Sequence, residues 1–324
     1  MSEGVKKVSG NGRKMIELMS PAGSLEGAKL AFDAGADIVY AGVKNLSMRP
    51  KRVEFDQNLG ELIDYAHGRG RKVYATTNVC PKPSDIPLFE KRMAEVSALG
   101  ADAVIVSDPW VMEHVRDNYP DLPIHASIMT SVVNAEAARF YKERGAGMVV
   151  VSRSLGDLDE IRRIKDEVNV DLEVFVHGGI CYMYDGDCYM SSYWRQKRDF
   201  DPDLGVFRLF GQNNTKGECQ LICKRDCALT ADGEELAKGR LMRRPDDVGL
   251  DRLPAYIDIG VRVLKIEGRA MSLNYIAEAT KLYRQAIDLY YVDPERWTML
   301  EEWRPAIDQL IEERLDYEKT WHIG

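Results

Sequence analysis

The sequence predicts an α/β fold: a (β/α)8 TIM-like barrel with a long Cys-rich insertion between strands seven and eight, and a helical C-terminal tail. The chain has 324 residues, and one such barrel needs about 250. Eight short apolar runs alternate with amphipathic stretches, which favours a parallel sheet crossed by helices. This alternation is interrupted once, between about residues 177 and 261, where little periodicity is visible.

The expected strands are short and mostly β-branched or apolar throughout, as in strands buried on both faces. They are Ile16–Met19, Ile38–Ala41, Lys72–Ala75, Ala103–Val106, Ile124–Ser127, Met148–Val151, Glu173–Val176 and Arg262–Ile266. The expected helices include Ser24–Ala34, Asn58–Gly68, Ile86–Leu99, Asn134–Arg144, Leu158–Val168 and Ala277–Tyr291. Eight repeats of the same unit favour closure into a barrel over an open sheet.

Three regions follow from this pattern. Residues 1–14 are polar and contain no apolar run, so we expect a disordered leader and no signal peptide. Residues 15–291 are expected to form the barrel, including a Cys-rich insertion at 178–250. Residues 292–324 form a Trp-bearing helical tail, which we expect to pack on the barrel exterior without a functional role.

Composition limits the function. The net charge of −8 argues against broad, sequence-independent binding of nucleic acid. Two basic runs, Arg195–Arg198 and Arg240–Arg244, are either local basic patches or solvated surface charge. No run of about 18 apolar residues occurs, so we expect no membrane span and a cytoplasmic protein. In that reducing compartment, clustered cysteines suggest a metal or catalysis more than disulfides.

Five of the six cysteines lie close together in the insertion, with the spacing C-x6-C-x30-C-x3-C-x3-C. They are Cys181, Cys188, Cys219, Cys223 and Cys227, whereas Cys80 stands apart. Thiolates are soft ligands that select zinc, copper(I) or iron–sulfur clusters. The first spacing fits a zinc knuckle poorly, and the last three cysteines miss the radical-SAM pattern by one residue. The residues alone leave a metal or cluster site, structural thiols and redox chemistry open.

Three separated motifs carry a resemblance to a known family. The stretch EVFVHGGICYMYDGDCYMS, from Glu173 to Ser191, is similar to the signature of the collagenase-like peptidase family (family U32). LMSPAGSLE from Leu18 and VLKIEGR from Val263 resemble the opening and closing motifs of that family. Gly179 stands where the family has Ser or Ala. The resemblance runs from about residue 16 to 290.

Within this family the chain is most similar to the short members that act in ubiquinone biosynthesis. This implies a [4Fe–4S] cluster, oxygen-independent hydroxylation of an aromatic or quinone-precursor ring, and a heterodimer with a paralogous family member. Longer relatives hydroxylate a pyrimidine in tRNA or rRNA. The short members carry a fourth ligand where this chain has Ala237. A Gly-x-Cys-x3-Cys run like that of the RNA-modifying relatives is present instead. The implied ligands are Cys181, Cys188, Cys219 and Cys223, with Cys227 in reserve.

The resemblance leaves other functions open: an RNA pyrimidine hydroxylase, a non-catalytic cluster-bearing partner subunit, or a peptidase as the family name suggests. The zinc-protease motif H-E-x-x-H is absent from the sequence.

Polar residues after the strands are the candidate catalytic groups, because barrel enzymes keep their sites at that end. Glu267 and Arg269 follow strand eight, and Lys265 is expected to point into the barrel. Glu267 and Arg269 suit proton transfer and anion or carbonyl binding, or form an internal ion pair. His177, at the end of strand seven, either tunes a cluster or substrate or is structural. Further residues expected at the same mouth are Asn78, Asp108, Ser127 and Arg153.

Overall fold

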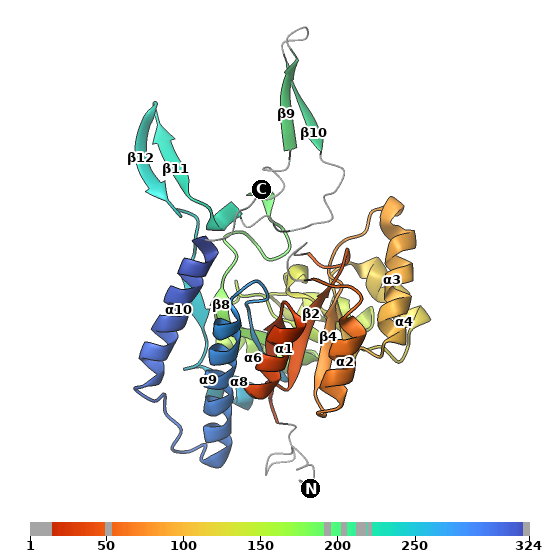
Figure 1. Cartoon of the computed structure of the whole chain (residues 1–324), viewed down its shortest axis with the longest axis vertical. Coiled ribbons are helices and arrows are strands. Elements are labelled where there is room, and N and C mark those ends of the chain that lie inside the picture. Colours follow the sequence, from red (N-terminus) through yellow and green to blue (C-terminus); the bar gives the residue numbers. More distant parts are fainter. Residues whose placement is uncertain are drawn as a thin grey trace.

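The centre of the molecule is a closed ring of eight parallel strands (Figure 1). This computed structural model describes residues 15–48, 54–190, 196–201, 206–211, 219 and 222–319. The ring closes because β1 (Glu17–Ala22) pairs with β2 (Ile38–Val43) on one side and with β14 (Val263–Ile266) on the other. The other members are β4 (Lys72–Thr76), β5 (Ala103–Val106), β6 (Ile124–Ala126), β7 (Ala146–Val150) and β8 (Asp171–Gly179). The predicted barrel is confirmed, and each of the eight predicted runs overlaps one strand.

Helices connect the strands on the outside of the ring (Figure 1). The predicted ones are α1 (Leu25–Asp33), α2 (Leu59–His67), α3 (Ile86–Ala98), α5 (Ala135–Glu143), α6 (Leu158–Glu167) and α9 (Leu273–Val292). Ser24 and Asn134 begin α1 and α5 by accepting a hydrogen bond from a backbone N–H of the first turn. Two helices that the sequence did not single out, α4 (Pro109–Asn118) and α8 (Leu253–Ile259), carry a proline in their first turn.

Short elements complete the barrel. They are β3 (Glu54–Phe55), β13 (Asp246–Val248) and the single-turn helices η1 (Pro83–Asp85) and η2 (Ile128–Thr130). The strand β13 runs antiparallel to the end of β8, with Val248 opposite His177. Among the described residues, no helix is long and apolar enough to cross a membrane.

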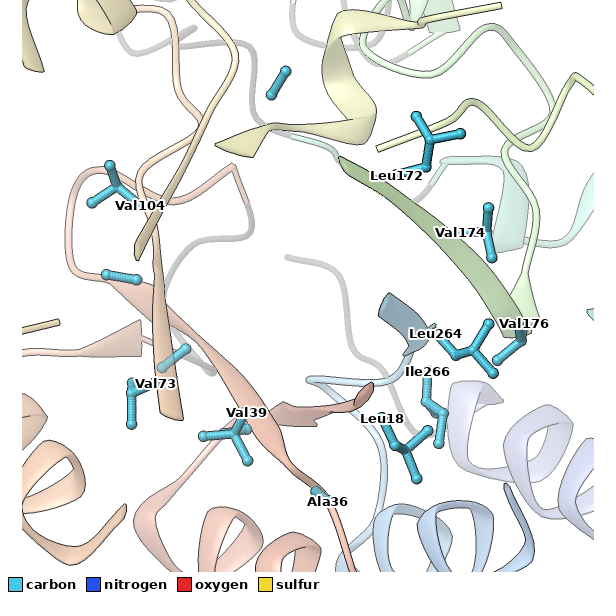
Figure 2. Close-up of a cluster of buried hydrophobic side chains, with 14 of the residues drawn as sticks. Leu18, Ala36, Val39, Val73, Val104, Leu172, Val174, Val176, Leu264 and Ile266 are labelled. Carbon is cyan, nitrogen blue, oxygen red and sulfur yellow. The ribbon is translucent and has the colours of Figure 1, made fainter. Parts of the chain in front are cut away.

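Side chains alternate between the inside and the outside of the ring, as the pleat of a strand requires. Val39, Val174 and Leu264 point outward toward the helices (Figure 2) and belong to the main core. A smaller cluster fills the inside: Met19, Ile38, Tyr40, Tyr74, Ala103, Ile105, Met148 and Val263. Fully burying one such side chain stabilises the fold by about 1.5–3 kcal/mol. The inside of the barrel is therefore packed with apolar side chains, and the polar residues lie above them, towards the carboxyl ends of the strands.

The insertion between β8 and β14 contains two β-hairpins that leave the same end of the barrel (Figure 1). One pairs β9 (Gln196–Asp201) with β10 (Val206–Gly211), and the other pairs β11 (Cys227–Ala231) with β12 (Glu234–Gly239). The turn η3 (Ile222–Lys224) lies between them in sequence. Neither hairpin was predicted from the sequence. The predicted leader, residues 1–14, lies outside the described residues.

The tail is helical, as predicted: α10 (Trp303–Lys319) packs against α9. Trp303 is buried, and so are Arg314 and Glu318 near the other end of the helix. The two charged side chains do not face solvent, because they enter a network of ions at the mouth of the barrel. The tail therefore packs on the exterior helix α9, as expected, and in addition carries two charged side chains into the mouth of the barrel.

Candidate functional site at the carboxyl end of the barrel

The segments that follow the strands meet at one end of the barrel, as expected. Asn78, after β4, donates from Nδ2 to Oγ of Ser127, after β6, over 3.2 Å. Its Oδ1 accepts from the backbone N–H of Met48, after β2, over 3.0 Å. Asp108, after β5, instead caps α4 by accepting from the N–H of Trp110. Asn78 and Ser127 thus hold the rim together, whereas Asp108 has a structural role.

An ion pair lies inside the barrel below this rim. Nζ of Lys265, on β14, is 2.7 Å from Oε1 of Glu173, on β8, and both side chains are buried. The ammonium also lies 4.3 Å from the centre of the Tyr40 ring and 5.1 Å from that of Phe175. Burial lowers the pKa of Lys265, although Glu173 opposes the shift. The prediction that Lys265 points into the barrel is confirmed, and its partner is a residue that the sequence did not single out as catalytic.

Two arginines add positive charge around this pair. The guanidinium carbon of Arg153 is 3.9 Å from the centre of the Phe175 ring. That of Arg269 is 5.6 Å from the centre of the Tyr40 ring, and its Nη1 donates to Oγ of Ser47 over 2.9 Å. Both arginines lie close enough to Lys265 for their charge to lower its pKa, so three cations gather in the upper barrel. The upper barrel can therefore attract an anion or polarise a carbonyl oxygen.

Glu267 is held from outside the barrel. Its carboxylate forms an ion pair with Arg314 of α10, and its Oε2 accepts from the N–H of Gly179 over 3.4 Å. Its own backbone N–H donates to the carbonyl of His177 over 2.9 Å. An ion pair was the alternative expected for Glu267, but its partner here is a residue of the tail. Glu267 thus fastens the end of β8 to α10.

His177 is fully buried between β8 and α9. Its ring centre lies 5.8 Å from that of Tyr275 and 5.6 Å from that of Tyr283, both on α9. Burial, helped by the positive charge of Arg314 and Arg153, lowers the pKa of His177 to about 3, so the ring is neutral. The imidazole faces the helix layer and not the inside of the barrel. This position favours the structural role that the sequence left open.

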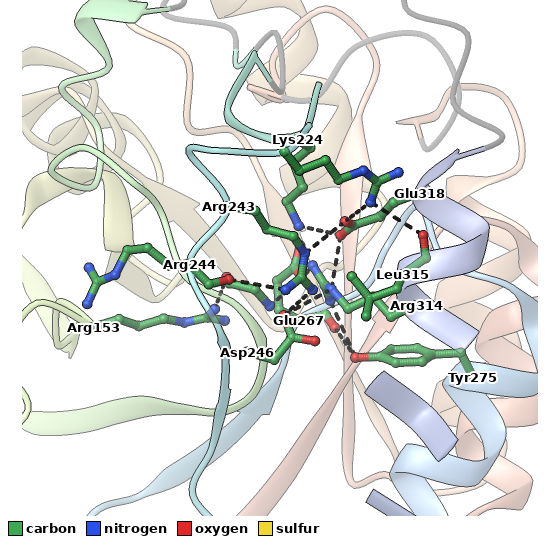
Figure 3. A network of polar contacts seen from close by, with 12 residues as sticks. Arg153, Lys224, Arg243, Arg244, Asp246, Glu267, Tyr275, Arg314, Leu315 and Glu318 are labelled. Carbon is green, nitrogen blue, oxygen red and sulfur yellow. Dashed lines mark hydrogen bonds and ion pairs between the residues drawn. The ribbon is translucent and has the colours of Figure 1, made fainter. Parts of the chain in front are cut away.

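A buried network of ions links α10 to the insertion (Figure 3). The carboxylate of Glu318 contacts Lys224 and lies 3.1 Å from Nε of Arg314, 3.5 Å from Nη1 of Arg240 and 3.6 Å from Nε of Arg243. Burial alone would lower the pKa of Arg314, but Glu267 and its other partners raise it overall. One carboxylate thus gathers cations from three separate segments.

Asp246, at the start of β13, extends this network. Its Oδ1 lies 2.9 Å from Nη2 of Arg243 and 3.7 Å from Nε of Arg314. The two arginines of the run 240–244 that enter the network, Arg240 and Arg243, are therefore structural and not a patch open to nucleic acid. The first basic run lies on and beside β9, and its side chains fall outside what the structure describes.

Two of the predicted ligands lie on the loop after β8. Cys181 is exposed, and its carbonyl accepts from Nη1 of Arg244 over 3.4 Å. Cys188 is half-buried. The segment before this loop approaches η3, because a Cβ atom added to Gly179 would lie 2.7 Å from Nζ of Lys224. Lys224 follows Cys223 directly, so the segments that carry Cys181 and Cys223 lie side by side.

The remaining cysteines differ in their surroundings. Cys219 is half-buried, and its N–H donates to the carbonyl of Met48 over 3.3 Å, which places it near the rim. The thiol of Cys227 lies 3.5 Å from the carbonyl oxygen of Gly239, its partner in the β11–β12 hairpin. That contact ties Cys227 to its hairpin, and the choice of Cys223, with Cys227 in reserve, stays a prediction. Cys80 is exposed after β4.

Within the described ranges, no three side chains of the types His, Cys, Asp and Glu lie close enough together to hold a metal ion. The four-cysteine ligand set therefore stays a prediction. The donors nevertheless fit an iron–sulfur cluster, because they are soft thiols on segments that meet at the mouth. Arg244, which contacts the backbone of Cys181, would offset part of the negative charge of thiolates bound to a cluster.

The sequence model of Peptidase family U32 matches residues 23–323. The chain is 31% identical over 314 residues to a tRNA hydroxylation protein of Bacillus subtilis (strain 168), covering 92% of this chain and 70% of that protein. It is 36% identical over 286 residues to a protein of Methanocaldococcus jannaschii named an uncharacterized protease (85% and 65%). It is 30% identical over 275 residues to a 23S rRNA 5-hydroxycytidine synthase of Escherichia coli (strain K12) (84% and 39%). The chain thus spans only part of each of these relatives.

Proposed function

The chain belongs to peptidase family U32, and from this premise we propose that it takes part in oxygen-independent hydroxylation of a pyrimidine in RNA. The observation that carries the proposal is the similarity, over most of this chain, to relatives named for tRNA hydroxylation and 5-hydroxycytidine synthesis. The barrel mouth supports it, because cations, aromatic rings and cysteine-bearing loops gather there.

The cofactor that we propose is a [4Fe–4S] cluster held by Cys181, Cys188, Cys219 and Cys223. When bound, such a cluster would supply electrons or activate an oxygen donor. Metal sites are rarely complete before the metal binds, so the thiols need not be gathered beforehand. The contact between Lys224 and Glu318 would keep the turn that carries Cys223 against the barrel.

The residues inside the barrel would bind and orient the base. Arg153 and Arg269 would attract a phosphate or a carbonyl oxygen of the pyrimidine. Nζ of Lys265 lies 2.7 Å from Oε1 of Glu173, and burial makes the lysine easier to deprotonate. This pair could therefore give or accept a proton at the ring. Glu267 is a positioning residue, because Arg314 holds its carboxylate.

RNA is better supported than the other substrates that the sequence left open. The hypothesis of a quinone-precursor substrate depended on the resemblance to the short family members. This chain differs from them at Ala237, where they carry the fourth cluster ligand. The names of the Bacillus subtilis and Escherichia coli relatives point to RNA instead. A peptidase is supported by the family name and by the name of the Methanocaldococcus jannaschii relative. A heterodimer with a paralogous family member is compatible with either hydroxylation and stays a prediction.

Anaerobic purification followed by iron and sulfide analysis tests the cofactor. We expect a brown protein with about four irons per chain, the content of one such cluster. Cys181→Ala should lose the iron, whereas Cys80→Ala should keep it, and both cysteines are exposed so that the two variants are matched. A colourless protein that carries zinc, or iron loss only in Cys80→Ala, would refute the ligand set.

The RNA substrate is tested by mass spectrometry of nucleosides from tRNA and rRNA of a strain that lacks the gene. We expect one hydroxylated pyrimidine to disappear and to return when the gene is restored. An unchanged set of modified pyrimidines would exclude this function.

A further inference from the structure

The loop that follows β8 exposes three tyrosine rings. Tyr182, Tyr184 and Tyr189 keep 49%, 65% and 64% of their surface in contact with solvent. Of the other tyrosines that the structure describes, Tyr317 alone is exposed, at 37%, and Tyr275 and Tyr283 of α9 are fully buried. Large aromatic rings left in water on one short segment often mark a binding surface. We call residues 181–190 the tyrosine loop.

The tyrosine loop is held in place from within. Oδ2 of Asp185, which is buried, accepts from Oγ of Ser152 over 2.8 Å and from the N–H of Arg153 over 3.3 Å. Gly186 has φ +83°, and a Cβ atom there would lie only 1.9 Å from the carbonyl oxygen of Met129. No other residue fits this turn without moving the backbone. The rings are therefore presented by a fixed turn, and ordering them on binding costs little.

Cations lie beside the same loop. Nη1 of Arg244, an exposed residue, donates to the carbonyl of Cys181, and Nη1 of Arg153 donates to the carbonyl of Gly179, two residues before it. Aromatic faces next to guanidinium groups are the combination that binds single-stranded RNA, since bases stack on the rings and phosphates meet the cations. An apolar peptide would use the rings but would gain little from the arginines.

We propose that the tyrosine loop binds unpaired bases of a single-stranded or loop region of the RNA substrate. This rests on the proposed function and names the form of RNA that the site accepts. Enzymes that act on a base must take it out of the duplex, because its reacting atoms are stacked inside. The tyrosines lie next to Cys181 and Cys188 in the sequence, so a base stacked there would lie at the barrel mouth.

Fluorescence anisotropy tests the proposal, with two labelled RNAs as probes: a stem-loop with a seven-nucleotide loop, and a fully paired duplex of the same composition. Anaerobically purified wild-type protein should bind the stem-loop more tightly. Each of the variants Tyr182→Leu, Tyr184→Leu and Tyr189→Leu should weaken binding about 5- to 160-fold if its ring stacks on one base. The corresponding Phe variants keep the aromatic face and should bind within about twofold of wild type.

The variant Phe140→Leu is a matched control, because Phe140 is an exposed ring on α5 at the outside of the barrel. It should bind the stem-loop like wild type. Leu and Phe variants that bind equally well, a wild type that binds no RNA, or equal affinity for the duplex would each overturn the proposal. Single variants are used because each ring is largely exposed, and thermal melting confirms that they fold.

The assay involves no hydroxylation, so the two ideas fail separately. Stacking that is intact in a protein without hydroxylating activity would contradict the proposed function alone. Hydroxylation with an unchanged KM in a protein that lacks all three rings would contradict the stacking role alone.

Discussion

Glu318→Gln should destabilise the protein strongly, because it removes one negative charge from the buried network with almost no change in size. The side chain of Glu318 is fully buried. Without its charge, the four cations would keep Asp246, Glu267 and the exposed Asp226 as opposite charges: Lys224, Arg240, Arg243 and Arg314. Removing one partner of a buried ion pair costs about 3–5 kcal/mol. At about 2.1 cal/mol/K of unfolding entropy per residue, this lowers the Tm by roughly 4–7 °C for a chain of this size.

Thermal melting followed by circular dichroism measures this effect, with Glu312→Gln as the control. Glu312 lies on the same helix but is exposed, so its loss should change stability by less than about 0.5 kcal/mol. A Tm for Glu318→Gln no lower than that of the control would refute the network. Lys224→Met and the double variant complete a cycle, and we expect about 0.5–3 kcal/mol of coupling between the two sites. Purely additive effects would contradict the direct contact.

Three further predictions follow from the barrel and its mouth. Burial, with Lys265 adding to it, lowers the pKa of His125 to about 3, so its contribution to stability is present above pH 6.5 and is lost as the pH falls toward 3. Measured by urea unfolding, the free energy of unfolding of wild type should fall by about 2 kcal/mol more than that of His125→Phe when the pH is lowered from 8 to 5. An equal fall in the two proteins would contradict this. Lys265→Met leaves Glu173 buried without its partner and should cost about 3–5 kcal/mol. Adding Glu173→Leu should recover most of that stability, and a double variant no more stable than the single one would refute the pairing. Because few cations flank the tyrosine loop, log K for stem-loop RNA should fall with log[salt] with a slope of about −1.4, the value for two phosphate contacts; a slope steeper than about −3 would indicate a different surface.

The barrel could be predicted from the sequence because its strands are buried on both faces. Continuous apolar runs such as Val104–Val106 then read as strands without reference to any partner. The hairpin β11–β12 gave no such signal, because its residues are mostly exposed and carry no apolar alternation. A bulge between Leu229 and Thr230 interrupts its register further.

The site was predicted in part, for the same physical reason. Positions after strands are fixed by topology, so Asn78 and Ser127 were expected at the mouth and lie there. The pleat of a strand likewise directed Lys265 into the barrel, where it pairs with Glu173. Ion partners are not fixed in this way, since Lys224 and Glu318 are 94 residues apart. One signal was present: Trp303, Ile307 and Leu310 continue at helical spacing to Arg314 and Glu318. That spacing places two charged residues on the buried face of α10, which indicates an internal network.

The most direct test of the account restores the deleted gene as wild type, as Cys181→Ala or as Cys80→Ala, and measures hydroxylated pyrimidines in RNA from each strain. The account predicts that wild type and Cys80→Ala restore the modification and that Cys181→Ala does not. Full restoration by Cys181→Ala would contradict the claim that this cysteine supports RNA hydroxylation at the barrel mouth.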